Sequence, residues 1–261
     1  MNIQIQNFRS IQSLNQTLKM NDVNIVQNSD VLQAMAIGLS RFLPYLSTAY
    51  QRFNKQGRGF NDGDNNASIT IQVNDIAWTC SSESSEGDEK QLAQYSQSFI
   101  QSENPSSPLV IYYDKDFFES EIKIDTKLDD GESSNYPTTA MKNALANNTK
   151  AQIATWFWHR ENAELRSKQP DRILTCIRQF CKNIYINSNN EFVITHNNEK
   201  TLLSELPIQE QNTILITMDL IRRAMIARTN NKNMIVLIDN FKNYIEPIAK
   251  ILAKDMTFIT C

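Results

Sequence analysis

The sequence predicts an α/β fold built on a largely parallel sheet. Met234–Ile238 is an unbroken apolar run rich in β-branched residues, and such runs are typical of strands that are buried on both faces of a parallel sheet. Apolar residues recur at helical spacing over 245–252, and 256–260 predicts another strand, so the three segments together favour a βαβ unit. Leu109–Tyr113 is a second apolar run that predicts a further buried strand.

Length and composition exclude several other classes of protein. The chain has 261 residues and 41% apolar residues, which suffices for one large α/β domain. Its net charge of −3 gives no overall basic signal for a nucleic-acid partner. No apolar run approaches the ~18 residues of a transmembrane helix, and the N-terminal residues lack the apolar core of a signal peptide. We therefore expect a cytoplasmic protein without a membrane partner.

The remaining elements follow from periodicity and turn residues. Alternation of Ile3, Ile5 and Phe8 with polar residues predicts an N-terminal strand. Ser29 or Asp30 suits the N-cap of a helix that begins near Val31. The other expected elements are strands at 23–26 and 67–78, a short helix at 91–100, a polar insertion at 119–150, helices over 151–183, a hairpin over 185–195 and a helix over 210–226.

Several segments resemble one family. IQNFRSI (5–11), LSRFLPYL (39–46), PLVIYY (108–113) and VLIDNFKNYIEP (236–247) resemble bacterial AAA-type ATP-binding proteins of the SMC/RecF-like ABC-ATPase class, which are associated with virulence, DNA transactions and phage defence. The resemblance implies a P-loop NTPase (ABC/SMC-like) domain with a largely parallel sheet, an N-terminal antiparallel β layer and an inserted helical arm. It implies a single domain over 1–261, with an N-terminal lobe (1–118), a polar insertion and arm (119–183) and a C-terminal lobe (184–261).

The resemblance also points to nucleotide-site residues. Asp239 ends the Met234–Ile238 strand, and a carboxylate there is suited to holding Mg²⁺ beside a phosphate. In the family this segment is the Walker B motif, and its catalytic acid comes next, where this chain has Asn240. Arg9 and Ser29 would lie near the nucleotide.

The loop that cradles phosphates is missing. Such a loop needs glycines that let the backbone wrap the phosphates and a lysine that reaches them. Here no lysine occurs between Lys19 and Lys55, and no glycine precedes Gly38. Asp30 also places a negative charge where a phosphate would sit.

The family signature is altered as well. Ser204, Pro207, Gln209 and Glu210 fall on that motif, and the same alignment brings Asp219, Arg222 and Arg223 onto the family's D-x-x-R-R pattern. Pro207 supplies neither the hydroxyl nor the N–H that grips the γ-phosphate.

These observations predict a degenerate ATPase that acts as a binding or regulatory subunit in a bacterial defence or DNA-related system. ATP and Mg²⁺ are the family's cofactors, but hydrolysis is not expected. The alternatives are a working ATPase linked to DNA and a truncated or decayed ATPase fragment. His159 and His196 have no ligand spacing, so no further metal is expected. We expect a protein partner or homo-oligomer that uses 242–261 or the Arg222/Arg223 helix end.

Overall fold

The structure is a computed structural model. It describes residues 1–20, 22–42, 65–73, 76–82, 92, 109–126, 144–145, 149–196, 199–227, 234–239 and 257–260. The helix expected over 245–252 lies outside these residues, as do nearly all of the expected 91–100 helix and most of the polar insertion.

The N-terminal part of the chain forms an antiparallel sheet with strand order β2-β1-β4-β5. Its strands are β1 (Asn2–Phe8), β2 (Ile11–Thr17), β4 (Ser68–Val73) and β5 (Ile76–Ser81). The apolar residues of β1 alternate with polar ones and face the core, and Ile3 lies opposite Ile71 of β4. The alternation of Ile3 and Ile5 with polar residues gives this strand one buried face, and the pattern breaks at Gln6 and Asn7 before Phe8.

A second sheet is parallel and has the strand order β3-β11-β10-β6. Its strands are β3 (Val23–Ile25), β11 (Thr257–Thr260), β10 (Met234–Ile238) and β6 (Leu109–Tyr113). Every residue of β6 and β10 is buried, so the prediction of two buried strands at these positions is confirmed.

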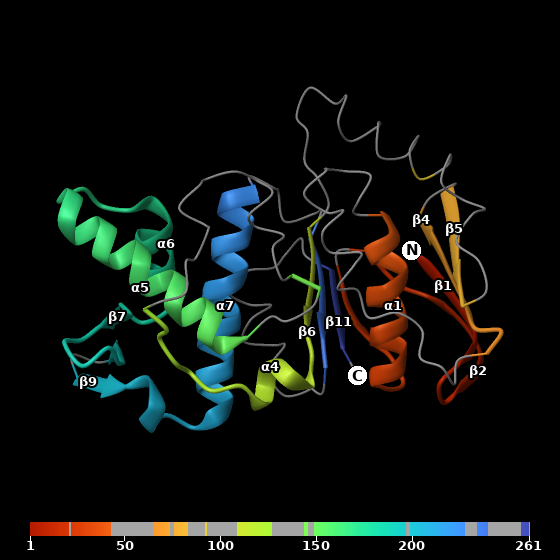
Figure 1. The fold of residues 1–261 in the computed structure, drawn as a ribbon, viewed down its shortest axis with the longest axis horizontal. Helices are drawn as coiled ribbons and strands as arrows, with labels where there is room; N and C mark the ends of the chain where they lie inside the picture. Colours follow the sequence, from red (N-terminus) through yellow and green to blue (C-terminus); the bar gives the residue numbers. More distant parts are fainter. Residues whose placement is uncertain are drawn as a thin grey trace.

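Helix α1 (Ser29–Phe42) lies between the antiparallel and the parallel sheets and contacts both (Figure 1). Gly38 permits this close packing, because a Cβ there would stand 2.5 Å from Cδ1 of Ile71. The Trp78 indole N–H donates to the Gly38 carbonyl over 2.8 Å. The hydrogen bond satisfies a buried polar group at the same contact.

The predicted P-loop NTPase domain with its largely parallel sheet is wrong. Among the described residues the parallel sheet has four short strands and is no larger than the N-terminal antiparallel sheet, and a third sheet is separate from both. β6 and β10 are buried along their whole length, whereas Val23 and Ile25 of β3 are 40% and 60% exposed. Two apolar runs therefore indicated the central strands correctly but did not fix the extent of the sheet.

The remaining described part is mostly helical. α7 (Ile208–Ala227) stands between the parallel sheet and the helical arm, which we define as α5 (Lys150–Ser167) and α6 (Arg172–Phe180) (Figure 1). A small antiparallel sheet follows the arm. The other elements are α4 (Lys115–Glu119), β7 (Tyr185–Ile186), β8 (Phe192–His196), β9 (Glu199–Leu202) and the 3₁₀ turn η4 (Leu203–Glu205).

Of the two surfaces expected to carry association, the structure describes β11 within 242–261 and the Arg222/Arg223 helix end. β11 is paired with β10 on one side and β3 on the other, so it is no open edge. Arg222 and Arg223 are only 3% and 1% exposed, because α7 is packed against the rest of the molecule. Association itself stays a prediction. In the part of the chain that the structure describes, no helix is both long and apolar enough to cross a membrane.

Candidate functional site

The carboxyl end of the parallel sheet brings together two predicted site residues from distant parts of the chain. Asp239 directly follows β10, and its backbone N–H donates to the Tyr113 carbonyl over 2.9 Å. The hydroxyl of Ser29, the first residue of α1, donates to Oδ1 of Asp239 over 2.6 Å. Asp239 is 7% exposed, whereas Ser29 is exposed, so this hydrogen bond is only partly buried.

Arg9 lies at the same edge. Its Nη1 is 3.6 Å from Oδ1 of Asp30, next to Ser29, and the Ser10 hydroxyl donates to the other oxygen of Asp30. Arg9 also has a positive φ of 49°, in the tight turn between β1 and β2. The structure therefore gathers Arg9, Ser29 and Asp239 at one edge, while Asn240 lies outside the described residues.

The edge suits a divalent cation better than a phosphate chain. The Ser29 hydroxyl and the Asp239 carboxylate are hard oxygen ligands of the kind that Mg²⁺ prefers, and Mg²⁺ commonly keeps several waters as its other ligands. Asp30, by contrast, puts a carboxylate in the first turn of α1, where a phosphate would be bound. No group of three or more His, Cys, Asp or Glu side chains that could hold a metal is found among the described residues.

A second carboxylate at this edge, Asp114, has a structural task. It follows β6 and is the N-cap of α4, where its Oδ1 accepts the Phe117 N–H over 3.0 Å. N-capping satisfies a backbone donor that the helix leaves unpaired. At least one oxygen of Asp114 is therefore committed to α4.

The signature-like residues form the beginning of a helix instead of a phosphate grip. The Pro207 carbonyl accepts the Glu210 N–H over 2.8 Å and so opens α7. Ser204, Pro207 and Gln209 are exposed, and Glu210 pairs with Lys182, which follows the arm. These contacts tie the start of α7 to the arm and not to the edge with Ser29 and Asp239.

The most deeply buried charges lie elsewhere, on α7. Asp219, which is fully buried, accepts hydrogen bonds from the Tyr113 hydroxyl over 2.8 Å and from Nε of Arg223 over 2.9 Å. Its other oxygen is 2.5 Å from Nη2 of Arg222, whose guanidinium lies 5.1 Å from the centre of the Trp156 ring. We call these five residues the buried charge cluster.

Burial and neighbouring charges shift the pKa values of Asp219 and Tyr113 in the cluster in opposite directions. Burial alone would raise the pKa of Asp219, but Arg223 and Arg222 outweigh it and lower that pKa to about 2. Burial, followed by the Asp219 charge, raises the pKa of Tyr113 well above its usual range. The cluster is therefore a fixed ion group with a neutral tyrosine at neutral pH. From the sequence, Asp219, Arg222 and Arg223 set an alignment, and the two arginines were expected at an association surface; the i, i+3, i+4 spacing of the three on an apolar helix was the available signal for the cluster.

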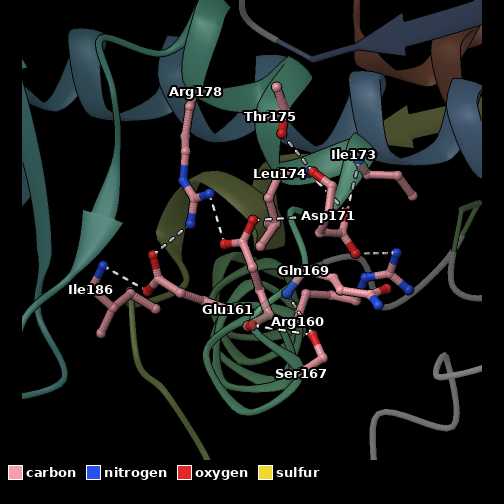
Figure 2. Close-up of polar contacts among 11 residues, drawn as sticks. Arg160, Glu161, Ser167, Gln169, Asp171, Ile173, Leu174, Thr175, Arg178 and Ile186 are labelled. Carbon is pink, nitrogen blue, oxygen red and sulfur yellow. Dashed lines mark hydrogen bonds and ion pairs between the residues drawn. The ribbon is translucent and has the colours of Figure 1, made fainter.

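A second polar network holds the arm together (Figure 2). Arg178 of α6 bridges Glu161 at 3.0 Å and Glu164 at 2.7 Å, both on α5. Glu161 also accepts the Ile186 N–H of β7 over 2.9 Å. Asp171 caps α6 and pairs with Arg160 at 2.6 Å.

The pKa directions in this network follow from competing causes. Burial raises the pKa of Glu161, and the Ile186 N–H and Arg178 offset only part of that effect. Burial acts to lower the pKa of Arg178, but Glu164 and Glu161 outweigh it, so the pKa rises. The network thus locks α5, α6 and the small sheet into one unit.

The chain matches no family model and no curated protein.

Proposed function

We propose that this chain is a binding or regulatory protein that does not hydrolyse ATP, and that it acts in a bacterial defence or DNA-related system. The setting rests on the resemblance of its motifs to ATP-binding proteins of such systems. The absence of turnover rests on the edge of the parallel sheet. The observation that carries it is the Arg9–Asp30 pair at the start of α1, because it engages the one cation described at this edge and places a carboxylate where a phosphate would be bound.

Chemistry supports the same conclusion. Phosphoryl transfer depends on positive groups around the γ-phosphate and on a residue that orients the attacking water. The one cation described at this edge, Arg9, lies against Asp30, and Asp114 caps α4. Losing a single contact to developing charge typically costs ~2.7–4 kcal/mol of transition-state stabilisation. In the described part of this edge several such contacts are lacking together, so turnover would fall by many powers of ten.

The test is phosphate release from Mg²⁺-ATP by the purified full chain. Asp239→Asn is the informative variant, because it keeps the shape of the side chain and removes its charge. Glu121→Gln is the matched control, since Glu121 is an exposed acid elsewhere on the chain. We expect wild type and both variants to show the same background. Phosphate release that Asp239→Asn abolishes and Glu121→Gln retains would overturn the proposal.

A second candidate function is binding of Mg²⁺-nucleotide without hydrolysis. The specific observation in its favour is that a serine hydroxyl and an aspartate carboxylate, 210 positions apart, meet at 2.6 Å at a strand end, since such a pair holds Mg²⁺ in many nucleotide-binding proteins. Calorimetry with Mg²⁺ alone and with Mg²⁺-ATP separates the two candidates. Binding heat that Ser29→Ala and Asp239→Asn both remove would favour binding of Mg²⁺-nucleotide. An absence of heat with the wild-type protein would favour a binding or regulatory protein that does not use nucleotide.

A further inference from the structure

The turn between α5 and α6 forms a basic tip. We define the arm tip as residues 165–172, which end α5, make the turn and begin α6. Figure 1 shows this turn at the outer end of the molecule, on the far side of α7 from the two larger sheets. Residues 165–170 and Arg172 are exposed, so the tip is open to a large partner.

The solvent-facing charge of the arm tip is positive. Arg166, Lys168 and Arg172 are exposed, on a chain whose net charge is −3. The neighbouring acids are turned inward: Asp171 is 2.6 Å from Arg160 and its side chain is 18% exposed. Glu164, one residue before the tip, is 2.7 Å from Arg178, with 15% exposure. The outward face of the tip therefore carries three positive charges and has its acids engaged in the arm's own network.

Helix stability does not explain two of these cations. Lys168 ends α5 in the left-handed region, with φ of 55°, a position that favours glycine. Arg172 is the first residue of α6, at the positive end of the helix dipole, where acids are favoured. Only Arg166, in the last turn of α5, stands where the dipole favours a cation. Residues that are unfavourable for the local backbone or helix, and that bring no compensating stability, are expected at functional positions.

We propose that the arm tip binds the phosphate backbone of double-stranded DNA. Arginine, lysine and glutamine side chains are among the usual donors to phosphate oxygens, and the tip presents Gln169 beside its cations. This step goes beyond the proposed function, since it names a partner for the binding protein and is tested without ATP.

Other partners fit the tip less well. Leu165, 70% exposed, is its one large apolar side chain, whereas protein interfaces have apolar, aromatic-rich centres. Membrane recognition by charge uses clusters of roughly four to eight cations, and the tip has three. It has no aromatic side chain on which unpaired bases could stack, so a duplex fits it better than a single strand.

The experiment is fluorescence anisotropy of a labelled DNA duplex of about 20 base pairs, long enough for the contacts that neutralise phosphates, with the full chain. Three phosphate contacts predict a slope of log K against log salt near about −2.7, so affinity should fall roughly 40-fold between about 50 and 200 mM salt. The test variant is Arg166→Gln/Lys168→Gln/Arg172→Gln. The matched control, Lys19→Gln/Lys115→Gln/Lys123→Gln, removes the same charge from exposed positions outside the arm.

We expect the tip variant to bind at least about tenfold more weakly at low salt, with a flatter slope, and the control to bind like wild type. Lys168→Gly adds a check on folding, because glycine suits the left-handed position and should keep the arm as stable as wild type while still weakening DNA binding. Equal weakening in both triple variants would overturn the proposal. So would an unchanged Lys168→Gly, or binding of wild type to vesicles with about 30% phosphatidylserine but not to DNA.

Discussion

Replacing Asp219 by asparagine should destabilise the whole fold, because it removes the only carboxylate described in the buried charge cluster. The asparagine side chain would keep the volume and could still accept the Tyr113 hydroxyl. It would leave the guanidinium groups of Arg222 and Arg223 beside each other, at 3% and 1% exposure, without the negative charge between them. Breaking a buried ion pair from one side typically costs ~3–5 kcal/mol. That is a large part of the ~5–15 kcal/mol by which a domain is stable.

The pH dependence gives an independent estimate. The folded protein holds the pKa of Asp219 at about 2, against an ordinary value of 3.8, so ionised Asp219 stabilises the fold. One pKa unit corresponds to about 1.36 kcal/mol, so the lowered pKa is worth about 2 kcal/mol at neutral pH. This contribution is present above pH ~4 and is lost as the pH falls through ~2.

Urea unfolding at neutral pH, followed by tryptophan fluorescence, measures the stability lost in Asp219→Asn. The same measurement from pH 5 to about 2 shows how the stability of the wild-type protein depends on the ionised Asp219. Tyr113→Phe removes one hydrogen bond to the carboxylate and should cost less, ~1.5–3 kcal/mol. Glu121→Gln, at an exposed acid, is the neutral control. If Asp219→Asn unfolds like Glu121→Gln, or keeps the acid sensitivity of wild type, the charges do not form the cluster described above.

Three further substitutions test the packing. Leu237→Ala, at a fully buried position of β10, should lower the free energy of unfolding by ~2–5 kcal/mol through lost burial and a cavity, and a wild-type urea midpoint would contradict the sheet assignment. Gly38→Ala should cost ~1–3 kcal/mol, because its Cβ would stand 2.5 Å from Ile71 Cδ1; calorimetric melting checks it, and an unchanged melting temperature would count against the close α1 contact. Glu161→Ala should leave the part-buried Ile186 N–H without its acceptor at ~1–3 kcal/mol, while Arg178 keeps its ion pair with Glu164; faster amide exchange at Ile186 is the readout, and unchanged exchange would argue against the arm network.

Local signals in the sequence predicted local structure well. The alternation in β1 and the unbroken apolar runs of β6 and β10 indicate strands, because these patterns depend only on residues that are close in the sequence. The helices of the arm were predicted for the same reason. Thr149 and Gln152 form a capping box at the start of α5, and Lys168 ends the helix, so its limits are also set locally.

Pairing between distant segments could not be predicted in this way. β1 pairs with β4, so that Ile3 lies opposite Ile71, and nothing near either residue specifies the other. An apolar run shows that a strand is buried but not how many strands flank it. The inference of one large parallel sheet from two such runs was therefore wrong, although β6 and β10 are parallel neighbours.

The candidate site shows the same division. Family resemblance placed Arg9, Ser29 and Asp239 near one another, and the structure brings them to one edge, but residue spacing alone could not have joined Ser29 to Asp239. The buried charge cluster was missed because its tyrosine comes from β6, 106 positions before Asp219. Charges spaced i, i+3 and i+4 on one helix are equally typical of a solvent-exposed face. Their burial cannot be predicted until the other elements that cover them are known.

Tyr113 joins the two polar sites that the structure reveals. Its carbonyl accepts the Asp239 N–H over 2.9 Å, and its hydroxyl donates to Asp219 over 2.8 Å. Arg222, paired with Asp219, lies over the ring of Trp156 on α5, so a continuous set of contacts runs from the edge with Ser29 and Asp239 to the helical arm. Coupling between distant sites requires such a physical connection together with an element that has two states. Since the connection runs through buried side chains that pair with one another, we infer that β6, α7 and α5 move as one body.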